Sequence, residues 1–156
     1  EALAELRVIN KDKDMFKSDK VKRAESAFLM GTVFDAMDDP LNANRSYLAV
    51  VSAFGAFPDW VTQAWERYIA NSAEDIAAMP EGAPEEALKK RERELAVYKL
   101  TRKYLYQWQE WTDEDAPSGA LRRLRRDIDT MKNEMGITPE EEQRVLFELG
   151  LTGEQQ

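Results

Sequence analysis

Neither cysteine nor histidine occurs among the 156 residues of the chain. Without cysteine there is no disulfide, no thiolate nucleophile and no cysteine-ligated zinc or iron–sulfur site. Without histidine the chain lacks the commonest general base and the commonest ligand of transition metals. We therefore predict a protein that is not an enzyme and uses no metal and no cofactor, with carboxylate-based catalysis as the alternative.

Long apolar runs and an excess of positive charge are also missing. No window of about 18 apolar residues occurs, so we expect no membrane span. The formal net charge of −8 argues against bulk affinity for nucleic acid. The hydrophobic share of 43% is nevertheless enough for a core, which excludes a disordered chain. Because disulfides are absent and charge is dense, we expect an intracellular, cytoplasmic location.

Helical periodicity runs through nearly the whole sequence, whereas alternating strand patterns are almost absent. We predict an all-α bundle of six or seven helices in a single domain, 1–156. The longest helix is expected at about 85–111, in a central position. Pro40 is expected to end the helix before it. The loop 79–84, "MPEGAP", is a candidate seam between sub-domains.

The segment "NEMGITPEEEQRVLFELG", residues 133–150, resembles the sequence of a DNA-binding helix-turn-helix. However, Glu140, Glu141 and Glu142 would meet DNA phosphates with like charge. A capped helix explains the same residues, with Thr138 as N-cap and Glu141 completing a capping box. We therefore interpret 139–149 as a structural helix that does not read DNA.

Four arginines stand close together in "LRRLRR", at Arg122, Arg123, Arg125 and Arg126. They fall in the first turns of a predicted helix, where the helix dipole disfavours positive charge. Two of them can pair with aspartates four residues on, which would leave a merely solvated face. Otherwise the negative charge comes from the segment "TDEDA", from an acidic partner protein, or from nucleic-acid phosphate.

Aromatic residues are dense in "VYKLTRKYLYQWQEW", where Tyr104, Trp108 and Trp111 share one face of the predicted long helix. The apolar arc of this helix is wider than one neighbouring helix needs. A central position in the core explains such an arc. A protein interface, in which tyrosine, tryptophan and arginine are enriched, is the main alternative, followed by stacking on single-stranded nucleic acid.

One family resemblance is carried by "ALRRLRRDIDTMKNEMGITPEEEQRV", residues 120–145. The segment resembles the closing part of phage small-terminase proteins, in which a Leu/Arg-rich helix runs into an E-x-G-[IL]-T-P turn and a short final helix. The matching residues are Leu121, Leu124, Arg125, Glu134, Gly136, Ile137, Thr138, Pro139 and Arg144. The resemblance implies an oligomeric, non-catalytic subunit that recognises viral DNA for packaging, in the virion or in the host cytoplasm.

From the residues themselves we predict a helical binding or assembly protein that acts through protein–protein contacts, with self-association as one form. Its expected contact residues are the four arginines together with Tyr104, Trp108 and Trp111. A phage DNA-packaging subunit is one alternative. An acidic inhibitor that mimics nucleic acid, using clusters such as Glu140–Glu142 and Asp113–Asp115, is another.

Overall fold

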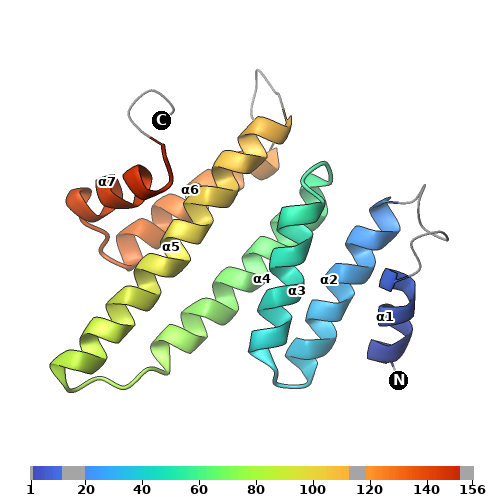
Figure 1. The fold of residues 1–156 in the computed structure, drawn as a ribbon, viewed down its shortest axis with the longest axis horizontal. Helices are drawn as coiled ribbons and strands as arrows, with labels where there is room; N and C mark the ends of the chain where they lie inside the picture. Colours follow the sequence, from blue (N-terminus) through green and yellow to red (C-terminus); the bar gives the residue numbers. More distant parts are fainter. Residues whose placement is uncertain (1, 12–19, 113–118, 152–156) are drawn as a thin grey trace. The chain divides into compact units, whose positions relative to one another are not determined.

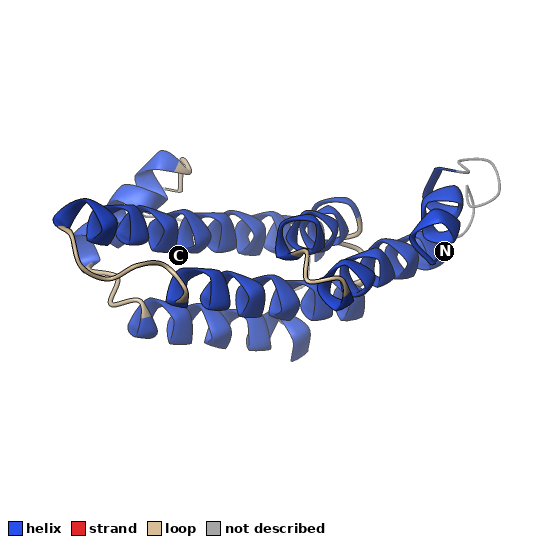
Figure 2. Ribbon diagram, turned by 90° about the horizontal axis from the view of Figure 1, so that it is seen from below, coloured by secondary structure: helices blue, strands red, loops and turns tan. Residues whose placement is uncertain are grey.

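The computed structural model describes residues 2–11, 20–112 and 119–151, apart from the side chains of 9–11, 108–112, 120 and 121. Every described element is a helix, and loops join them (Figure 2). The protein is therefore an all-α helical bundle, as predicted. The described helices are α1 (Ala2–Lys11), α2 (Lys20–Ala36), α3 (Pro40–Ala53), α4 (Pro58–Ala77), α5 (Pro84–Thr112), α6 (Gly119–Glu134) and α7 (Pro139–Glu148). None of these helices combines the length and the apolar character that crossing a bilayer requires.

Capping residues explain where two of the helices begin. The Thr138 side chain accepts from the Glu141 backbone N–H, and the Glu141 side chain accepts from the Thr138 backbone N–H, so the predicted capping box is present. The role predicted for Pro40 was wrong. Helix α2 already ends at Ala36, and Pro40 is the first residue of α3, where its missing N–H costs nothing. Asp39 caps α3 by accepting from the Asn42 backbone N–H.

The contacts gather into two units, residues 1–71 and residues 72–156. The division falls inside α4, whereas the sequence suggests a seam in the loop 79–84. A single domain for the whole chain stays a prediction. Each unit is therefore described by itself.

In the first unit, α2 packs against α1 on one side and α3 on the other (Figure 1). Its core contains the Phe28 ring, whose centroid lies 5.6 Å from that of Tyr47 and 5.4 Å from that of Trp60. Gly31 permits the close approach of α2 and α3, because a Cβ atom at this position would lie 2.3 Å from a Tyr47 ring carbon. The tight contact thus depends on the absence of a side chain.

In the second unit, α5 contacts both α6 and α7. Helix α6 runs alongside α5 in the opposite direction (Figure 1). The buried side of α6 consists of Leu124, Ile128 and Met131, spaced three and four residues apart. Helix α7 buries only Val145 and Leu146 of its ten residues. The long helix is thus the central element of its own unit.

Candidate binding surface on helix α6

The arginines of α6 lie on the side of the helix that is opposite its buried apolar residues. Leu124, Ile128 and Met131 lie on the buried side, within about 60° of one another around the helix axis. The hydroxyl of Thr101 on α5 donates to the Met131 sulfur over 3.8 Å. At about 3.6 residues per turn, Arg122 and Arg126 fall on the opposite side. Both are exposed, as are Arg123 and Arg125. We call these four residues the arginine face.

The arginine face has little compensating charge. Its one ion pair among the described residues joins Arg126 Nε to Asp127 Oδ1 at 3.8 Å, and the Arg126 side chain is 73% exposed. Arg123 and Arg125 make no ion pair within the described part of the chain. The four-apart pairs that the sequence permits therefore do not form. The acidic residues 113–115 of "TDEDA" lie outside the described residues. The face therefore presents nearly unpaired cations in the first turns of a helix, where the dipole adds positive potential.

The aromatic residues predicted for the same surface belong to the adjoining end of α5. Thr101 lies level with Met131, and the two helices rise equally per residue in opposite directions. The backbone of Trp108 is accordingly level with Leu124, within the arginine-bearing turns. Tyr104 is half-buried, and this burial raises the pKa of its hydroxyl. The side chains of Trp108 and Trp111 lie outside the described residues.

The acidic triplet of α7 is largely occupied inside its own unit. The Arg91 guanidinium pairs with the Glu141 carboxylate through both Nε, at 3.0 Å, and Nη2. Arg91 also donates to the backbone oxygens of Met135 at 2.5 Å and Gly136 at 2.9 Å, so it ties the turn before α7 to α5. The Arg91 hydrogen bonds and the Thr138 backbone N–H hold the pKa of Glu141 below its usual value.

Glu142 occupies a second internal site. Its carboxylate accepts from the Tyr98 hydroxyl at 2.8 Å and from the Lys132 ammonium group. Burial raises the pKa of Glu142, but the hydrogen bonds from Lys132 and Tyr98 outweigh burial, so the net shift is downward. Two of the three carboxylates in the Glu140–Glu142 cluster thus serve to attach α7. This favours the structural interpretation of the helix over a DNA-reading one.

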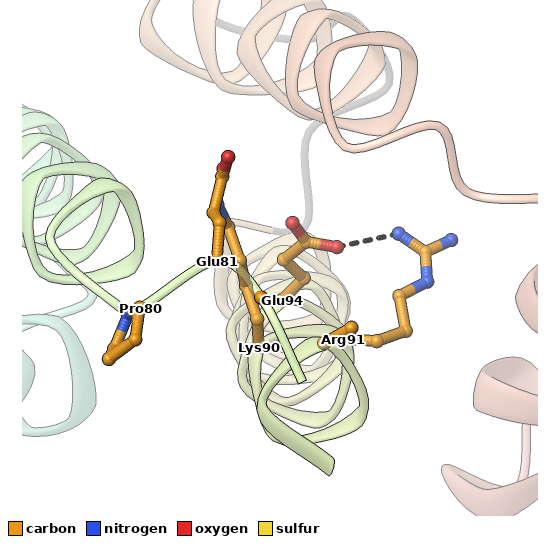
Figure 3. Close-up of a pocket in the computed structure, with 7 residues that line it drawn as sticks. Pro80, Glu81, Lys90, Arg91 and Glu94 are labelled. Atoms are coloured by element: carbon orange, nitrogen blue, oxygen red, sulfur yellow. Dashed lines mark hydrogen bonds and ion pairs between the residues drawn. The ribbon is translucent and has the colours of Figure 1, made fainter. Parts of the chain in front are cut away.

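A depression of about 310 Å³ lies between the loop after α4 and the first turns of α5 (Figure 3). Both cations in its lining have carboxylate partners. Lys90 Nζ lies 2.7 Å from Glu81 Oε1, and Arg91 Nη1 lies 2.7 Å from Glu94 Oε2. The polar groups of this depression are therefore engaged with one another, and it is a weaker candidate for ligand binding than the arginine face.

Within the described part of the chain, no group of three or more acidic side chains is arranged to hold a metal ion. In the segment "DAMDDP", residues 35–40, two of the three aspartates have structural partners. Asp35 accepts from the Tyr47 hydroxyl at 2.5 Å and from the Asn71 amide at 2.8 Å. Asp39 is the N-cap of α3.

The sequence interpretation missed Arg91, because its main partners are 44 to 50 residues away along the chain. The exposed position of the arginine face, by contrast, follows from helical spacing alone.

Comparisons with protein-family models, with curated proteins and with solved structures each give no match to this chain.

Proposed function

We propose that the protein is a non-catalytic binding protein, and that its arginine face docks onto an acidic surface of a partner protein. The observation that carries the proposal is the exposure of four arginines, of which three make no ion pair among the described residues. Guanidinium groups bind carboxylates in a bidentate geometry and lose less hydration than ammonium groups when they are buried. The C-terminal half of α5, with Tyr104, Trp108 and Trp111, adjoins the face and supplies aromatic residues of the kind that anchor interfaces.

Two observations weigh on the alternatives. Phosphate suits exposed arginines as well as carboxylate does, so a DNA-recognition subunit remains the second candidate, although the chain carries a net charge of −8. The acidic mimic has less support, since Glu141 and Glu142 are paired with cations of their own unit.

A binding titration separates the two candidates. The full chain would be titrated with a labelled glutamate-rich helical peptide and, separately, with a labelled DNA duplex, each at low and at moderate salt. We expect binding of the acidic peptide that weakens with salt, because exposed charges are screened. Arg122→Glu/Arg126→Glu should abolish it, whereas Arg7→Glu/Arg67→Glu changes net charge equally at exposed positions outside the face and should retain most of it.

Preferential binding of the duplex, with a steep loss of affinity as salt rises, would instead favour the DNA-recognition subunit. Equal binding by the two double variants would show that only net charge matters, and the proposal would fail. It would also fail if neither probe binds.

A further inference from the structure

A shallow groove between α2 and α3, separate from the arginine face, has an apolar floor and a charged rim. It measures about 290 Å³. Ala27, Met30 and Phe34 of α2 form the floor, and Asn42, Arg45 and the exposed Ala49 of α3 lie at the rim. An apolar cavity of about 150 Å³ is large enough for a benzene ring. The groove therefore has room for one aromatic side chain.

The rim provides a cation. Arg45 is exposed, and its hydrogen bond from Nη1 to Asn42 Oδ1 is long at 3.4 Å. Its charge helps to lower the pKa of Asp39, but the Asp39 carboxylate is engaged by Asn42 as the cap of α3. Arg45 forms no ion pair with any described residue. An incoming carboxylate would meet little competition there.

Helix α7 displays a group that matches this groove. Phe147 is 74% exposed, the most exposed large apolar side chain in the described part of the chain. Glu140 lies two turns earlier on the same face of α7 and is also exposed. Glu141, Glu142 and Glu148 each pair with a lysine or arginine, whereas Glu140 has no such partner among the described residues. The exposed face of α7 thus presents an aromatic ring and an unpaired carboxylate.

The exposed side of α7 is as long as the floor of the groove. Glu140 and Phe147 are seven residues apart, about 10 Å along a helix axis. The floor of the groove runs along α2 from Ala27 to Phe34, which is also seven residues. We propose that α7 of one copy docks into the α2–α3 groove of a second copy, with Phe147 on the apolar floor and Glu140 paired with Arg45.

Such a contact joins two different surfaces of the same chain. Each copy then carries one inserting helix and one receiving groove, so association proceeds head to tail and gives rings or open chains. The contact uses neither the arginine face nor the aromatic end of α5. It therefore stands or falls independently of the proposed function.

Sedimentation velocity over a concentration series tests the contact directly. We expect the full chain to associate, and Phe147→Ser to weaken the association by roughly tenfold or more, because the anchoring ring is lost. Arg45→Glu/Ala49→Glu should do the same by placing negative charge in the groove, at two exposed positions. Two controls act outside the groove and outside α7. Leu88→Ser removes another exposed apolar side chain, and Arg67→Glu/Ala70→Glu makes the same change of charge at two other exposed positions. Both should leave association unchanged.

Mixing the two defective variants gives the decisive result. The Phe147→Ser protein keeps its groove, and the Arg45→Glu/Ala49→Glu protein keeps its inserting helix. At a concentration at which each variant alone is monomeric, an equimolar mixture should form one-to-one dimers and nothing larger. A monomeric wild-type chain at every concentration overturns the proposal, and so does a mixture that stays monomeric. Unchanged association of Phe147→Ser overturns it as well.

Discussion

Replacing Gly31 by alanine tests the packing of α2 against α3 most directly. The added Cβ would lie 2.3, 2.7 and 2.7 Å from three carbons of the Tyr47 ring, well inside the optimum of about 3.5 to 4.0 Å between carbon atoms. Tyr47 is completely buried, and its hydroxyl is held by Asp35, so the ring has little room to yield.

The expected magnitude follows from two opposing effects. Overpacking of a core costs about 1 to 3 kcal/mol, and these contacts are close enough for the upper end of that range. Alanine in a helix interior is favoured over glycine by about 1 kcal/mol. We therefore expect a net loss of about 2 kcal/mol in the free energy of unfolding, and a melting temperature lower by roughly 4 to 8 °C for a chain of this size.

Urea unfolding of the full chain, followed by circular dichroism, measures this loss. Gly119→Ala is the matched control, because a Cβ at Gly119 would meet no atom within 4 Å. In a Tyr47→Leu background, Gly31→Ala should no longer destabilise the protein, since the ring that it would strike is gone. A neutral or stabilising effect of Gly31→Ala in the wild-type background would refute the reasoning.

Three further predictions concern ion pairs, caps and pH. Arg91→Met should lower the free energy of unfolding by about 2 kcal/mol in urea titrations, because Glu141 and two backbone oxygens lose the hydrogen bonds that Arg91 donates. Arg93→Met, at a more exposed pair, is the control. Thr138→Ala should cost about 1 kcal/mol in the same assay, and an unchanged midpoint would contradict the capping role. The pKa of Tyr47 is raised from 10.0 by burial and by its hydrogen bond to Asp35. Its contribution to stability is therefore complete below pH 10 and is lost as the pH rises beyond it, so Tyr47→Phe should flatten the alkaline fall in melting temperature.

Lowering the pH should weaken the attachment of α7 to α5. The pKa of Glu141 is lowered from 4.5, so its contribution is complete above pH 4.5 and is lost as the pH falls through its value in the folded protein. Melting curves between neutral pH and pH 3 should show this loss, and Glu141→Gln should reduce it. Equal acid sensitivity in wild type and variant would contradict the assignment.

Local features of the fold could be predicted from the sequence because their causes lie within about four residues. The N-cap at Thr138 with its partner Glu141 is confirmed. The described residues form seven helices, within the predicted six or seven, and α5 is the longest of them, as expected. The error at Pro40 has a local origin too. A proline suits the first turn of a helix as well as it ends the one before, and the Asp39 cap favoured the first role.

The candidate binding surface was partly predictable. Helical spacing alone places Arg122 and Arg126 opposite the apolar stripe of α6. Whether Arg123 and Arg125 pair with their aspartates is not fixed by spacing, since an exposed pair gains little over hydration and each side chain can extend into solvent instead. The groove that receives Phe147 in our proposal is formed by residues of two helices. The sequence pattern of either helix alone does not predict it.

The sequence by itself determined the helical class, the cap at Thr138 and the outward direction of the arginines, since each depends on neighbours along the chain. Only the tertiary structure decided that Glu141 meets Arg91, fifty residues away, and that Gly31 lies against the Tyr47 ring. It also decided that the contacts divide within α4 and not at the glycine- and proline-containing loop. Such partners are selected by how buried faces fit together, and many sequence-distant pairs would satisfy the same local pattern.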